Sequence, residues 1–184
     1  LLIAVEKVPD AMVVAMERCR DAGLQNVFFI DVDAALLPDM FEPEEIDRIY
    51  INFCDPWPKS NQAKRRLTHH NFLNLYRKVL KDGGEIYFKT DDDDLFRDSL
   101  EYFPASGYDI EWMTYDLHEN EPEWNIRTEH EGMFTEMGIK IKALIARKKA
   151  GDDSVTWVEP KVLKKLAAQA EAEASAKAEG EGNV

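Results

Sequence analysis

The chain has 184 residues, 45% of them hydrophobic, which suffices for one ordinary core and a tail but not for two full domains. A formal net charge of −13 excludes a protein that coats nucleic acid or anionic membrane non-specifically, so any contact with nucleic acid must be local. No apolar run approaches the roughly 20 residues of a membrane span, and the two cysteines, Cys19 and Cys54, favour buried free thiols in a reducing cytoplasm over disulfides.

The first third of the chain predicts three parallel strands that each end in an acidic residue. Residues 1–5 form a continuous apolar run, which is typical of a strand covered on both faces. A helix over 9–22 connects it to the second strand, with Pro9 in its first turn and Gly23 beyond its end. The strands and their terminal acids are 1–5 with Glu6, 27–30 with Asp33, and 48–53 with Asp55. Because parallel strands gather ligands at their carboxyl ends, these acids are expected to face one crevice.

The middle and last thirds continue the alternation of helices and strands. Thr68 is expected to cap a helix that stops at 82–84, the sequence Asp-Gly-Gly. The remaining predicted elements are a strand over 85–90, a helix over 95–103, a strand over 108–115, an irregular segment over 117–127, a short helix beginning near 128–131 and a strand over 139–146. This order specifies an α/β three-layer sandwich over residues 1–150. Residues 151–184, rich in Ala, Glu and Lys, are expected to be a disordered or loosely helical tail.

A loop of unusual composition follows the third strand. It reads Asp-Pro-Trp-Pro-Lys from Asp55 to Lys59, and Lys64, Arg65 and Arg66 come soon after. This places a carboxylate, a flat apolar face and cations together, a combination that suits a planar base on an anionic backbone. Seven Lys or Arg residues and no acid lie between positions 59 and 81, which indicates either a phosphate-contacting face or a solvated helix.

Several acids and histidines remain ambiguous on their own. Glu6 suits the two hydroxyls of a ribose and Asp33 an adenine amino group, although each taken alone more often is a solvated strand-end acid. The four aspartates at 91–94 favour a helix N-terminus over a metal site, because consecutive acids there cannot all face one ion. His69 and His70 are adjacent and predict a surface or phosphate-contacting role rather than zinc.

Taken together, the Asp-Pro-Trp-Pro-Lys loop with its basic cluster, Thr90-Asp91, and the Thr-Glu-His-Glu sequence at 128–131 closely resemble the bacterial tRNA (guanine-N7-)-methyltransferase family. The resemblance covers about residues 2–147. It implies a Rossmann-like class I methyltransferase fold, S-adenosylmethionine as cofactor, and methylation at N7 of a guanosine in the tRNA variable loop. It also implies a cytoplasmic protein with tRNA as partner, no metal and no membrane, acting as monomer or homodimer.

The resemblance also assigns roles to individual residues. It makes Glu6 and Asp33 cofactor-binding acids and puts Asp55 at the junction of cofactor and target base, as the catalytic residue. The residues implied on the substrate side are Lys59, Asp91, Thr128 and Glu131, and those implied on the tRNA backbone are Lys64, Arg65 and Arg66. Trp57 suits either stacking on a base or packing in the core.

One feature of the family has no counterpart here. Its fold begins with a strand and a glycine-rich loop that would precede Leu1, so we expect an N-terminally truncated piece of a longer chain, with two strand edges left unpaired. Three other functions stay open: a non-catalytic RNA-binding or scaffolding protein, a methyltransferase acting on an exocyclic amine, and, more remotely, a metal-dependent phosphotransfer enzyme built on 91–94.

Overall fold

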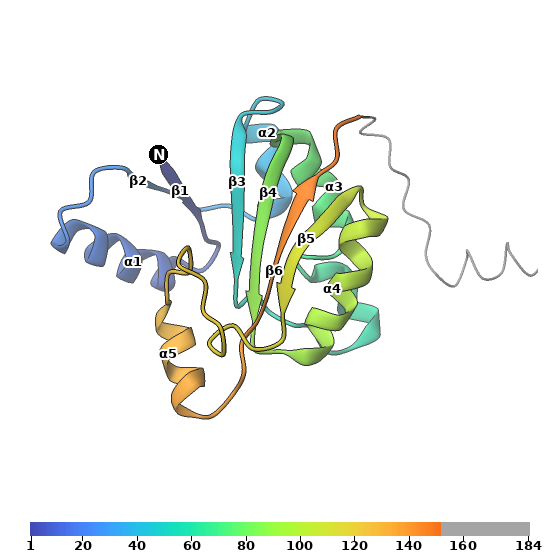
Figure 1. The fold of residues 1–184 in the computed structure, drawn as a ribbon. Coiled ribbons are helices and arrows are strands. Elements are labelled where there is room, and N and C mark those ends of the chain that lie inside the picture. The colour runs from blue at the N-terminus through green and yellow to red at the C-terminus, as the bar shows by residue number, and fades with distance from the viewer. Residues whose placement is uncertain (152–184) are drawn as a thin grey trace, which may run out of the picture.

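A computed structural model describes residues 1–151, in which helices alternate with strands in the predicted order (Figure 1). The expected tail at 151–184 lies, apart from Gly151, outside the described residues. In chain order the elements are β1 Leu2–Val5, α1 Pro9–Asp21, β2 Val27–Ile30, η1 Ala34–Leu36, α2 Leu37–Met40, β3 Ile46–Asn52, η2 Ser60–Arg65, α3 His70–Val79, β4 Leu80–Thr90, α4 Asp93–Ala105, β5 Tyr108–Thr114, α5 Glu129–Glu136 and β6 Lys142–Lys148.

The strands form two sheets. β1 and β2 pair in parallel, and β3, β4, β6 and β5 form a second sheet in that order, with β3 parallel to β4 and β6 antiparallel to both of its neighbours. Within residues 1–151 the two sheets share no strand pair, so the edges of β1 and β3 lack the continuous pairing that a single sheet would give them. The predicted α/β, Rossmann-like class is confirmed.

The core lies between the four-stranded sheet and the helices α3 and α4, which pack together on one of its faces (Figure 1). Ile86 and Phe88 of β4 contribute to it, as do Leu73 of α3 and Phe96 and Phe103 of α4, all fully buried. Alternate residues of β4 point the other way: Tyr87 contacts an exposed tyrosine of β3 and a tryptophan of the irregular segment. The well-packed sheet therefore provides a rigid base from which the strand ends project.

The two-stranded part is packed very differently. None of the residues of α1, β1 or β2 is buried, although all of them are described, and Val13, Met16 and Phe28 each expose about half of their side chains. An exposed ion pair between Arg18 of α1 and Glu129 of α5 links the part to the rest of the chain. Little buried apolar area therefore stabilises this part of the protein.

Two local predictions differ from the structure. The cap of α3 is His69 rather than Thr68, because the Thr68 hydroxyl is buried and accepts a hydrogen bond from Ser99 of α4. The helix ends at Val79 and β4 starts directly at Leu80, so the glycines at 83–84 lie inside a strand, next to a register shift in the pairing of β3 with β4.

Among residues 1–151 no helix is long and apolar enough to cross a membrane.

Candidate methyltransferase site

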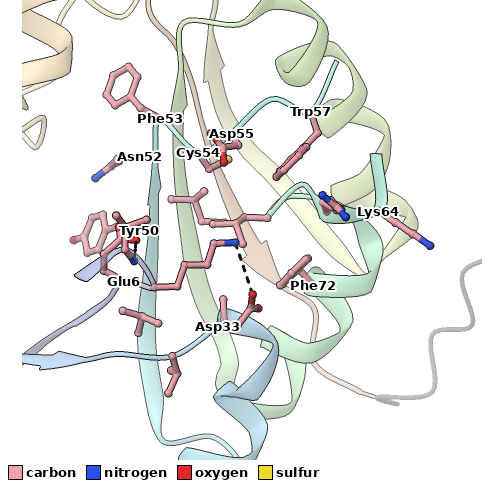
Figure 2. Close-up of a pocket in the computed structure, with 18 residues that line it drawn as sticks. Glu6, Asp33, Tyr50, Asn52, Phe53, Cys54, Asp55, Trp57, Lys64 and Phe72 are labelled. Carbon is pink, nitrogen blue, oxygen red and sulfur yellow. Dashed lines mark hydrogen bonds and ion pairs between the residues drawn. The ribbon is translucent and has the colours of Figure 1, made fainter. Parts of the chain in front are cut away.

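A cavity of about 790 Å³ opens at the carboxyl ends of β1, β2 and β3. This volume lies in the usual range for sites of small ligands. Figure 2 shows the side chains of Glu6, Asp33, Asp55 and Trp57 around the hollow, from segments far apart in the sequence. The predicted convergence of the three strand-end acids on one crevice is therefore observed.

Glu6 and Asp33 are each oriented by the backbone just beyond their strand. One oxygen of Glu6 accepts a hydrogen bond from the Val8 N–H at 2.8 Å, and one oxygen of Asp33 accepts from the Ala35 N–H at 2.9 Å. The Lys7 ammonium lies 3.8 Å from the second Asp33 oxygen, in an exposed pair. In both acids one oxygen is thus fixed by the chain, and the second oxygen of Asp33 is shared with Lys7 in a long, exposed ion pair.

The loop that carries Asp55 adopts a constrained backbone. Phe53 and Trp57, on either side of it, have φ values of 52° and 42°, in the left-handed region that residues other than glycine rarely occupy. Such conformations cost about 1–3 kcal/mol each and persist where surrounding contacts hold them. The Arg65 guanidinium lies over the Trp57 ring at 4.9 Å, so the indole is a packing face for a cation as well as a wall of the cavity.

The basic stretch at 59–81 does not form one solvated face. Arg66 and Arg77 are buried, with 4% and 2% of their surface exposed, and Lys81 pairs with Asp47. Arg66 donates to the carbonyls of Pro56 and Trp57 and to the Asp98 carboxylate, so its position does not fit the implied contact with the tRNA backbone. The exposed cations of the stretch are Lys59, Lys64, Arg65, Lys78 and the paired Lys81.

Two of the implied substrate residues, Thr128 and Glu131, belong to a hydrogen-bond network around the buried Lys89. Glu131 is fully buried; one of its oxygens accepts from the Lys89 ammonium at 2.7 Å and the Thr128 N–H at 2.9 Å, and the other accepts from Asn125 at 3.1 Å. Thr128 caps α5 and forms a capping box with Glu131. Burial alone would raise the pKa of Glu131, but the hydrogen bonds from Lys89, Asn125 and Thr128 outweigh it and the pKa lies below its usual value.

The network includes His118, Glu121 and Glu131, which are the one set of side chains within residues 1–151 close enough together to coordinate a metal ion. The carboxylate oxygens of Glu121 already accept from Arg127 and Asn125. A lysine and an arginine thus already supply positive charge to these carboxylates. At 91–94, Asp92 accepts from the Leu95 N–H and caps α4, the helix-start role that the sequence favoured.

Stacking connects the network to the Asp55 loop. The Phe53 ring stacks on His130 of α5, with centroids 5.6 Å apart. Asp91 follows β4, the parallel neighbour of β3, and therefore lies at the same edge as Asp55. The structure thus brings Asp91, Thr128 and Glu131 to the edge that holds the cavity, whereas Lys59 is an exposed residue that precedes η2.

Two features of the site escaped the sequence analysis. Lys89 looked like an ordinary strand residue, although a lysine in a strand buried on both faces signals a buried ionic partner. His69 and His70, expected on the surface, are buried, and their rings lie 3.7 Å apart, beside Tyr102 of α4. Burial is the largest cause that lowers the pKa of each histidine to about 4. The positive charge of Arg66 also lowers the pKa of His69, and that of His69 also lowers the pKa of His70.

Comparisons with known proteins give the same picture. A family model described as a putative methyltransferase matches residues 1–144. The tRNA (guanine-N(7)-)-methyltransferase of Clostridium tetani is 47% identical over 147 residues, and that of Clostridium novyi 48% over 149; each alignment covers 80% of this chain and 70% of the relative. The chain therefore spans about 70% of their length.

Solved structures match the fold at low identity. The [4+2]-cyclase SpnF has a TM-score of 0.56 at 16% identity, and the alignment covers 81% of this chain and 67% of SpnF. A SAM-dependent methyltransferase from Aquifex aeolicus has a TM-score of 0.53 at 11% identity, with coverages of 79% and 67%. The family model and the identities to the Clostridium enzymes show that this chain belongs to the tRNA (guanine-N(7)-)-methyltransferase family.

Proposed function

We propose that the protein transfers a methyl group from S-adenosylmethionine to N7 of a guanosine in the variable loop of tRNA. The observation that carries the proposal is the convergence of Glu6, Asp33 and Asp55 on one cavity that Lys64 and Arg65 also line. The carboxylates suit a cofactor with a ribose and an amino-purine, and the cations suit the backbone of a nucleic acid. The type of reaction is inferred from the chain's membership of the family.

The residues present fit this cofactor. Carboxylates at the ends of adjacent strands accept hydrogen bonds from ribose hydroxyls and from an adenine amino group, and the second oxygens of Glu6 and Asp33, not bound by the backbone, suit that role. Val32 and Phe72 add apolar wall in the same cavity. When bound, S-adenosylmethionine supplies an electrophilic methyl group on a sulfonium. The chain's own part is to hold the donor by Glu6 and Asp33 and to keep Asp55 between donor and base.

The proposed chemistry requires no proton abstraction before attack. Guanine N7 has an in-plane lone pair, so the enzyme has to align it with the methyl group and stabilise the positive charge that develops on the ring. Asp55 lines the cavity at the junction of the sheets, and its carboxylate would accept from the guanine edge and offset that charge. Glu131 is buried and fully engaged, so we propose that it acts by ordering the substrate side rather than by touching the base.

Exposed residues around this centre would hold the tRNA. Lys59, Lys64 and Arg65 are free to reach phosphates, and such contacts provide affinity without reading the sequence. Asp91 and Thr128, at the rim, would contact the nucleotide. The overall negative charge confines this attraction to the basic loop. We place the reaction in the cytoplasm, with tRNA as partner and the protein as monomer or homodimer.

Product mapping tests the proposal. The full-length enzyme is incubated with unmodified tRNA and labelled S-adenosylmethionine, and the methyl group is located by nuclease digestion and mass spectrometry. Label at N7 is expected; label on an exocyclic amine, or RNA binding without transfer, would establish one of the competing functions. Asp55→Asn should lower kcat by about 10²–10³-fold. Asp109→Asn, a substitution of an exposed acid on β5 that pairs with Lys149, is the matched control and should leave the rate unchanged.

A further inference from the structure

The turn that presents Asp55 cannot hold itself in place. Two of its residues, Phe53 and Trp57, have left-handed backbone conformations, and Pro56 and Pro58 have no N–H with which to close it. The strain favours relaxation unless other groups fix the turn. The contacts to its carbonyl groups are therefore decisive for where the Asp55 carboxylate lies.

Within residues 1–151, the hydrogen bonds to these carbonyl groups come from a single side chain. Arg66 Nε donates to the Pro56 carbonyl at 2.7 Å, and a terminal nitrogen of the same guanidinium donates to the Trp57 carbonyl at 3.2 Å. The other terminal nitrogen donates to Asp98 of α4 at 2.5 Å. The planar guanidinium of Arg66 thus connects the carbonyl groups of Pro56 and Trp57, which come directly after Asp55, to α4.

Arg66 differs from its neighbours in the basic cluster because its side chain is buried. It is 4% exposed, whereas Lys64 and Arg65 are exposed and reach solvent at the rim of the cavity. A phosphate group would have to displace Asp98 and uncover the guanidinium to reach it. Only the fork of an arginine satisfies both carbonyls and the carboxylate together, because a lysine presents one compact ammonium.

We propose that Arg66, anchored by Asp98, is a positioning residue that fixes the Asp55 turn for catalysis and does not bind tRNA phosphate. This inference rests on the proposed function, since it assigns Asp55 its role. It extends that function by making α4, outside the cavity, part of the apparatus that sets the rate. Loosening the fork moves the Asp55 carboxylate relative to both reactants, and displacements of about 1 Å can lower rates by up to 10²-fold.

The test separates rate from binding in the full-length enzyme with unmodified tRNA. Arg66→Lys, which keeps the charge but loses the fork, Arg66→Gln, which loses both, and Asp98→Asn are expected to lower kcat at least tenfold. They should leave the Kd for tRNA within about twofold, with an unchanged slope of log K against log salt. Arg65→Ala is the comparison and should reduce that slope by about one, as loss of one phosphate contact does. The control Asp94→Asn breaks an exposed ion pair with Arg97 on the same helix and should change neither quantity.

Each other outcome decides against the inference. A reduced salt slope for Arg66→Gln, which removes the charge, with kcat unchanged would make Arg66 a phosphate contact. A lower unfolding temperature for Asp98→Asn with unchanged kcat at a temperature where the variant is folded would make the fork merely structural. Asp98 is half-buried and asparagine nearly isosteric with it, so this variant should fold even if Arg66→Lys does not. Failure of the proposed function would look different, because the unsubstituted enzyme would then not label N7.

Discussion

Replacing Glu131 by glutamine should strongly destabilise the protein, because the substitution leaves a buried cation without its counter-charge. The Glu131 side chain is completely buried and that of Lys89 is 8% exposed. Breaking a buried ion pair from one side typically costs about 3–5 kcal/mol. The Lys89 ammonium would keep its hydrogen bonds to the Asn125 side chain at 2.8 Å and to the Ile126 carbonyl at 3.0 Å, which points to the lower end, about 3 kcal/mol.

The control is two residues away on the same helix. Glu129 pairs with Arg18, but both side chains are more than 60% exposed and the pair is screened by solvent, so Glu129→Gln should destabilise the protein far less than Glu131→Gln. Urea unfolding followed by circular dichroism measures both variants. Adding Lys89→Met to Glu131→Gln should recover part of the loss, and the double-mutant cycle gives the coupling.

The pH dependence follows from the lowered pKa of Glu131. A carboxyl group whose pKa is lower in the folded state stabilises the fold above its unfolded pKa, and that contribution disappears as the pH falls through the folded value. The difference between wild type and Glu131→Gln should therefore shrink in acid. If Glu131→Gln and Glu129→Gln lowered the free energy of unfolding by equal, small amounts at neutral pH, the reasoning would be refuted, because the buried network would then contribute no more to stability than a surface ion pair.

Three further predictions concern other parts of the site. Because the pKa values of His69 and His70 lie near 4 in the folded protein, the unfolded chain binds more protons between about pH 6.5 and pH 4. The free energy of unfolding should therefore fall by on the order of 1 kcal/mol for each pH unit of acidification in this range. His70→Gln should make this pH dependence shallower, as measured by urea unfolding at several pH values. Burial raises the pKa of Cys54 to about 11, so at pH 8 iodoacetamide should modify it far more slowly than a free cysteine, which mass spectrometry of the digested protein measures. Glu6→Gln should weaken S-adenosylmethionine binding by about tenfold in calorimetry, as expected for one charge-assisted hydrogen bond, and unchanged affinity would remove Glu6 from the cofactor site.

The sequence predicts the parts of this protein that depend on local pattern. The strands 27–30 and 108–115 and the helix from Pro9 were expected within a residue or two of where they lie, because apolar periodicity, a starting proline and a terminal glycine are local signals. The strand-end acids were equally visible. The paired parallel strands β1 and β2 bring Glu6 and Asp33 to one edge, so their convergence needed no knowledge of distant contacts, whereas Asp55 extends from the other sheet.

Contacts between distant residues account for what was missed. Arg66 looked like its neighbours Lys64 and Arg65, and only packing against Asp98, 32 residues later, shows it to be buried. Lys89 and its partner are 42 residues apart. The boundary between α3 and β4 was misplaced for a related reason, since pairing with β3 keeps residues 83–84 in a strand even though two glycines would otherwise end a helix and begin a turn.

The split between the two sheets has a thermodynamic consequence. Glu6 and Asp33 extend from β1 and β2, whereas Asp55 extends from the four-stranded sheet, so a ligand that fills the cavity touches both (Figure 2). Such a ligand acts as a tether, and its binding free energy becomes part of the free energy that keeps β1, α1 and β2 docked. Amide hydrogens of this part should exchange rapidly without the methyl donor and slow as its concentration rises, while those of β4 remain unaffected.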